Sequence, residues 1–137
     1  STAGDAQIGT NVLRHETTDT TTSYPTADGN TAASTNISIL PDDHAYAITA
    51  RVIARDTSTG DVADWIIKGT ATRGTGAGST AIEGTPTAEV ISVSSGASTW
   101  TVDLVADTTL GGAKVEVTGE AATTIHWVTE FNTVEVG

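Results

Sequence analysis

The chain has no cysteine and no methionine, and it has few aromatic or basic residues. Without cysteine it has neither a disulfide framework nor thiolate chemistry, although this absence alone assigns no cellular compartment. Six basic residues stand against seventeen acidic ones, which gives a net charge of −11. Such a surface repels phosphate backbones and anionic lipids, so we expect no nucleic-acid partner. No apolar run approaches the length of a membrane span, and we expect no membrane insertion.

Residue types that hold metals or perform catalysis are present but are not grouped. The three histidines are His15, His44 and His126. They share no spacing that would form a zinc site. Asp42-Asp43 and the pair Asp56/Asp61 could donate oxygens to calcium, but turn-capping aspartates are the favoured interpretation because the dense spacing of a calcium loop is missing. No nucleophile-elbow sequence occurs. We therefore expect no metal, no cofactor and no enzymatic activity.

A period-two alternation over residues 100–128 is the strongest pattern in the chain. Three successive runs each place apolar side chains on one face and polar ones on the other. The apolar members are Trp100, Val102, Leu104, Val115, Val117, Ile125 and Trp127. Glycine-containing turns separate the runs, which is typical of a β-meander with one buried face. We expect the core to be built here.

The same alternation recurs earlier in the chain. Residues 44–55 and 61–73 read as a long hairpin with a turn at Gly60, and Trp65 is expected in its core. Further short strands are expected at 80–84, 89–94 and 131–137, and no helix is expected. About nine strands with regular turns predict an all-β, antiparallel two-sheet β-sandwich of the jelly-roll or immunoglobulin-like kind. Residues 1–34 would form an N-terminal arm, a first strand and a long Thr-rich loop, and residues 35–137 the sandwich domain.

Two loops are candidate places for partner contact. Residues 17–33 form a long excursion that contains Tyr24 and an Asp28-Gly29-Asn30 turn, and we expect it to lie ordered across the protein or a neighbouring subunit. Tyr24 could stack against a glycan or could anchor the loop to the body. Residues 74–78, centred on Gly76, form the second loop.

Two arginines stand out because they share the polar side of one expected strand in a very acidic chain. Arg51 and Arg55 are a third of all basic residues. One interpretation is a set of cross-strand salt bridges to residues such as Asp64. The other is that they meet carboxylates of a neighbouring copy, which would make this sheet face an oligomer contact.

With these residues in view, residues 35–137 resemble a β-sandwich domain of virion proteins from tailed bacteriophages. The matching pieces are residues 46–55, 60–65, 84–86, 100–107, 115–128 and 133–136. The resemblance implies a non-enzymatic structural protein located in the virion, of the tail-fibre or capsid decoration (head-fibre) type. It further implies a homo-oligomer, expected to be a trimer, that contacts other virion proteins of the capsid or tail. A host-surface glycan-binding module is the alternative.

Overall fold

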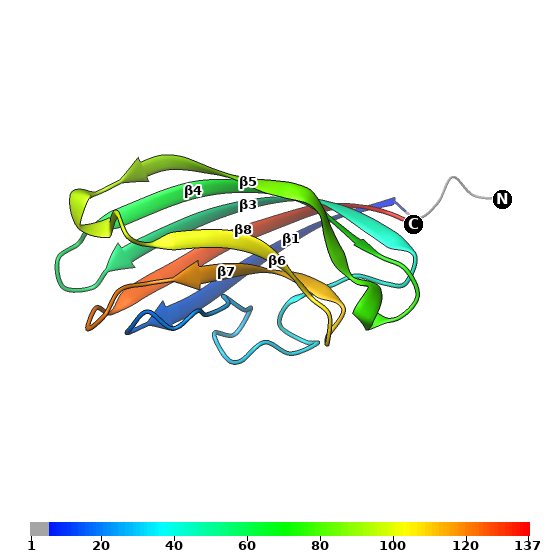
Figure 1. The fold of residues 1–137 in the computed structure, drawn as a ribbon, viewed down its shortest axis with the longest axis horizontal. Helices are drawn as coiled ribbons and strands as arrows, with labels where there is room; N and C mark the ends of the chain where they lie inside the picture. The colour runs from blue at the N-terminus through cyan, green and yellow to red at the C-terminus, as the bar shows by residue number, and fades with distance from the viewer. Residues whose placement is uncertain (1–5) are drawn as a thin grey trace.

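The computed structural model describes residues 6–137, which form two antiparallel β-sheets (Figure 1). The strands are β1 (Ala6–Thr17), β2 (Ser38–Ile39), β3 (His44–Asp56), β4 (Val62–Arg73), β5 (Ala81–Val93), β6 (Thr101–Asp107), β7 (Gly112–Thr118) and β8 (Ile125–Val136). Two short 3₁₀ turns, η1 (Ala77–Ser79) and η2 (Ser95–Ala97), precede and follow β5. None of the described residues belongs to a helix capable of crossing a membrane.

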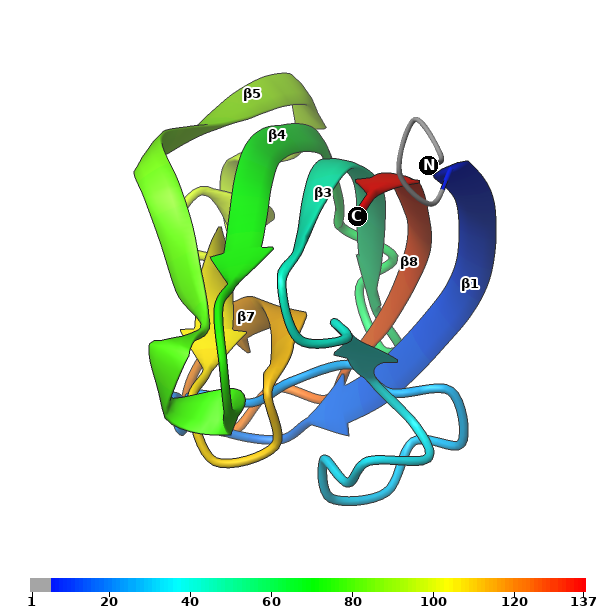
Figure 2. The same ribbon diagram turned by 90° about the vertical axis from the view of Figure 1, so that its right-hand side faces the viewer.

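The larger sheet has the strand order β1-β8-β3-β4-β5, and the smaller has the order β2-β7-β6. The larger sheet is curved, and the smaller one lies inside the curve (Figure 2). This arrangement confirms the predicted antiparallel two-sheet sandwich, with eight strands in residues 6–137 rather than about nine.

Two expected strand breaks are wrong. β5 runs unbroken from 81 to 93, although separate short strands were expected at 80–84 and 89–94, with Pro86 between them. Thr70 pairs with Glu83 and Lys68 pairs with Thr87, so three residues of β5 oppose one residue of β4 in a bulge. Because Pro86 lies in this bulge on an edge strand, its missing N–H costs no ladder hydrogen bond.

The second wrong strand break lies in β8, because residues 121–128 and 131–137 were expected to form separate strands. It continues through Thr129 to Phe131, and both side chains are fully buried on the face that Trp127 occupies. The expected three-stranded meander is also wrong. β6 and β7 pair with each other, whereas β8 lies in the other sheet between β1 and β3. Alternation identifies the buried face of a strand, but it does not say which sheet the strand joins.

The core lies between the sheets and is centred on the three tryptophans. Trp65 and Trp127, from the larger sheet, stack with ring centroids 5.9 Å apart. Trp100, directly before β6, lies with its ring centroid 6.0 Å from that of Trp127, and the two rings are tilted. All three indoles are at most 4% exposed, which confirms that they pack inward. The Nε1–H of Trp127 donates a buried hydrogen bond of 2.9 Å to the hydroxyl of Thr17.

Candidate functional site

The long loop of residues 17–33 is held against the body of its own chain. It makes a two-way backbone bridge with β1, where Arg14 and Thr26 exchange N–H···O=C bonds of 2.8 and 3.1 Å. A second bridge joins Ser23 to Val117 of β7, with bonds of 2.9 and 2.8 Å. Within the loop, Pro25 and Thr26 are fully buried. The expected ordered excursion is therefore confirmed, and it lies on the chain itself.

Asp28 is the centre of the turn that shapes this loop. One carboxylate oxygen accepts hydrogen bonds from the backbone N–H of Asn30 at 3.0 Å, the side-chain amide of Asn36 at 3.0 Å and the hydroxyl of Thr26 at 3.2 Å. These bonds, above all the one from the Asn30 N–H, stabilise the charged form and lower the pKa of Asp28 to about 2. Asp28, predicted as a partner-binding residue, is thus engaged in holding the loop.

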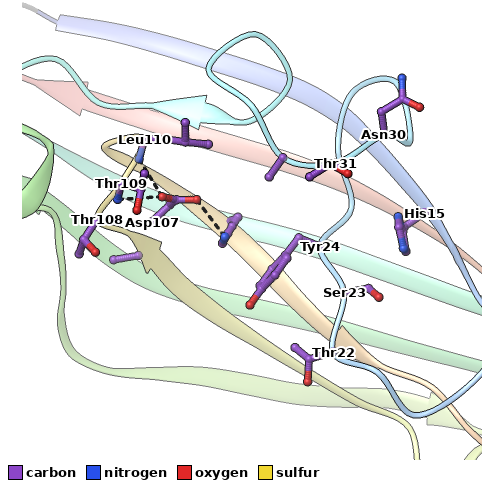
Figure 3. Close-up of a pocket in the computed structure, with 13 residues that line it drawn as sticks. His15, Thr22, Ser23, Tyr24, Asn30, Thr31, Asp107, Thr108, Thr109 and Leu110 are labelled. Carbon is purple, nitrogen blue, oxygen red and sulfur yellow. Dashed lines mark hydrogen bonds and ion pairs between the residues drawn. The ribbon is translucent and has the colours of Figure 1, made fainter.

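A broad surface pocket of about 610 Å³ lies between this loop and the turn that follows β6 (Figure 3). The loop contributes the phenol ring of Tyr24 and a set of hydroxyl and amide groups. The turn contributes the carboxylate of Asp107 and two threonine hydroxyls. The polar lining residues are His15, Thr22, Ser23, Asn30, Thr31, Asp107, Thr108, Thr109 and Lys114.

An ion pair and an aromatic ring fix one wall of the pocket. Lys114 Nζ lies 2.9 Å from a carboxylate oxygen of Asp107 and 3.8 Å from the ring centroid of Tyr24. The cation therefore makes a salt bridge and a cation–π contact together. Partial burial opposes ionisation of Asp107, but the N–H of Leu110 and the ammonium of Lys114 outweigh it and keep the pKa of Asp107 below its usual value. Tyr24 does anchor the loop, as one of the two interpretations expected, and it lines the pocket as well.

His15 contributes a buried polar atom at the side of the pocket. Its Nδ1 has no hydrogen-bond partner among the described residues, although buried polar atoms usually have one. The neighbouring loop positions supply hydroxyl groups, so this part of the pocket offers both donors and acceptors. An aromatic ring beside hydroxyl, amide and charged groups can bind a polyhydroxylated ligand through stacking and hydrogen bonds.

The structure brings together only some of the predicted contact residues. Tyr24 and Asn30 line the pocket, whereas Gly76 lies in the turn before η1, where its N–H donates to Asp42 at 3.0 Å. Arg51 makes the expected salt bridge with Asp64, with bonds of 3.1 and 2.7 Å. Arg55 has no ion pair with any residue in 6–137.

Sequence reasoning missed Asp107 and Lys114 as pocket residues. Both residues lie within the alternating pattern of residues 100–128, and that pattern gives no signal that they approach Tyr24 some ninety residues away in the sequence. Within residues 6–137, no three His, Asp or Glu side chains are placed so that they could hold a metal ion. In comparisons with known proteins, no family model matches the chain and no curated protein sequence matches it significantly.

Proposed function

We propose that this chain is a non-enzymatic structural component of a tailed-phage virion, either a capsid decoration (head-fibre) protein or a tail-fibre protein. It acts through homo-oligomeric display, as a trimer, and through contact with other virion proteins. Its place of action is the virion.

The observation that carries this proposal is the position of the resembling pieces in the fold. Residues 46–55 and 60–65 lie in β3, its turn and β4, and residues 100–107 and 115–128 span β6, β7 and the start of β8. The residues on which the resemblance rests therefore lie in both sheets, not in a single local motif. The three tryptophans among them form the centre of the core, which supports a role that depends on a stiff sandwich.

Stiffness suits a particle component for a physical reason. A rigid domain displayed in many copies converts weak single contacts into strong total binding, because the second contact is made at high effective concentration. In such a role the acidic exterior keeps the copies soluble before assembly.

The test is to look for the protein in purified particles. An antibody against the recombinant chain is applied to phage particles from the organism that carries its gene, and band intensity gives the copy number per particle. The proposal expects a fixed copy number that stays with the particle through density-gradient purification. Protein found in the lysate but absent from every particle fraction would refute it.

The pocket favours a second candidate function, the binding of a host-surface glycan. The specific observation is that Tyr24 and Asn30 lie in one pocket with the hydroxyls of Thr108 and Thr109. A glycan array probed with the oligomeric protein tests this function. Asn30→Ala is a suitable variant because it keeps the Asn30 backbone, whose N–H donates to Asp28 and whose carbonyl accepts from the Thr26 hydroxyl, and removes only the minor contact of the Asn30 side chain with Asp28.

Binding on the array that falls at least about tenfold in Asn30→Ala and in Tyr24→Ala, but survives in Tyr24→Phe, would support the glycan function. The phenylalanine control keeps the ring that contacts Lys114 and loses only the hydroxyl, whose bond to Glu116 is long at 3.5 Å. An array with no bound glycan would count against it.

A further inference from the structure

The convex side of the larger sheet differs in charge from the rest of the molecule. We call the outward-pointing residues of β1, β8, β3 and β4 the outer sheet face; they alternate with the buried residues of the same strands. Its basic residues are Arg14, Arg51, Arg55 and Lys68. Its acidic residues are Glu16, Asp64 and Glu130. The face therefore carries +1, and the remaining two basic and fourteen acidic residues of the sequence carry −12.

This uneven distribution of charge determines which surfaces of two copies can come into contact. Outside the outer sheet face each copy carries −12, so two copies repel each other strongly when these parts approach. Two outer sheet faces, each with a net charge of +1, repel each other only weakly. Arg14, Arg55 and Lys68 also have no ion pair with any residue of 6–137. They are available to a carboxylate of another copy, such as that of Glu130, whereas Glu16 is already paired with His126 at 2.8 Å.

One end of the outer sheet face is apolar and exposed. Ile8 is 78% exposed and Val134 is 58% exposed, and they are direct cross-strand partners. Val136, 55% exposed, lies on the same strand, and Val134 is flanked on its other side by Ala47 of β3. Monomeric proteins rarely leave neighbouring β-branched side chains this exposed unless something covers them.

The adjoining edge of the sheet is open as well. β1 is the outermost strand, and its residues 6–13 contain no charged side chain, no proline and no bulge. The opposite edge, β5, has the bulge, Pro86 and two glutamates, which are the usual devices against strand pairing. The β5 edge of this sheet therefore has features that prevent strand pairing, whereas the β1 edge beside Ile8 has none over residues 6–13.

We propose that the outer sheet face, with Ile8 and Val134 at its apolar end, is the surface through which this chain binds a second copy of itself. The inference deepens the proposed function and rests on it: in the homo-oligomer the outer sheet face of each copy meets the faces of its neighbours around the common symmetry axis. The apolar end excludes water, and the mixed charges of the other half fix how the copies are oriented.

Sedimentation equilibrium of the full chain tests the proposal, with three variants measured beside the unchanged protein. Val134→Glu and Val134→Lys each place a charge in the apolar end, and both should weaken association at least about tenfold. Val90→Glu is the matched control: Val90 is 55% exposed and lies on β5 of the same sheet, outside the face. It should associate like the unchanged chain. Far-UV circular dichroism checks that every variant is folded.

A monomeric unchanged chain would overturn the proposal. So would an oligomer that survives both Val134 substitutions, or one that Val90→Glu disrupts equally. The result is separable from that of the particle experiment, because a chain absent from particles can still self-associate through this face, and a particle protein can be monomeric in solution.

Discussion

Replacing Thr17 by valine should destabilise the sandwich through one hydrogen bond. The Thr17 hydroxyl accepts the Nε1–H of Trp127, whose side chain has no exposed surface, and Thr17 itself is 3% exposed. Valine has nearly the shape of threonine, so packing is retained while the indole N–H loses its acceptor. A buried donor left unsatisfied costs about 1–3 kcal/mol.

The magnitude translates into a shift of the melting temperature. At about 2.1 cal/mol/K of unfolding entropy per residue, a chain of 137 residues loses roughly 3.5 °C per kcal/mol, so Thr17→Val should melt about 3–10 °C lower. Differential scanning calorimetry measures this shift directly.

A second background isolates the hydrogen bond from any packing effect. In Trp127→Phe the donor is gone, so adding Thr17→Val should then cost less than about 0.5 kcal/mol. If Thr17→Val costs the same in both backgrounds, or nothing in the unchanged chain, the hydrogen-bond explanation is wrong.

Two further predictions concern turns. Gly76 and Gly111 both have positive φ, 83° and 82°, but a Cβ at 76 meets nothing whereas one at 111 collides with the guanidinium of Arg73. With ψ at 153°, Gly76 has a conformation that almost only glycine adopts, so Gly76→Ala should cost about 1–3 kcal/mol from backbone strain. Gly111→Ala should cost clearly more, and equal melting temperatures would contradict this. The pKa of Asp28 is lowered to about 2, so its stabilisation of the loop is present above pH 4 and is lost as the pH falls through 2. The side-chain amide signal of Asn36, followed by NMR, should shift with a midpoint near pH 2; a midpoint near 4 would show that this network does not form.

The alternation of side chains predicted much of the sandwich. The buried stripe of β3 and the inward tryptophans could be inferred because each strand has one apolar face, and a one-residue shift would expose it. Gly60 was identifiable as a turn residue, and its φ of 79° agrees. These features depend on residues close in sequence.

Features that depend on distant residues were not predictable in the same way. Pro86 indicated a strand end, but its place on an edge strand opposite Gly69 made a bulge possible, and an edge is defined only by the whole sheet. The pocket likewise arises because the loop bridge at Ser23 and Val117 brings Tyr24 over Lys114. No local pattern around Tyr24 or Lys114 announces that contact.

The position of β8 has a consequence for how the protein is made. β8 follows every other strand in the sequence, yet it lies inside the larger sheet and pairs along its whole length with β1 on one side and β3 on the other (Figure 2). During synthesis β1 leaves the ribosome first and has no strand partner until residues 125–136 emerge. The larger sheet therefore cannot assemble stepwise from its N-terminal end, and closure joins residues as far apart as Ala6 and Val136. Such long-range pairing makes folding slow, on the scale of milliseconds to seconds, and leaves the backbone N–H and C=O groups of β1 without their β8 partners until translation has passed β8.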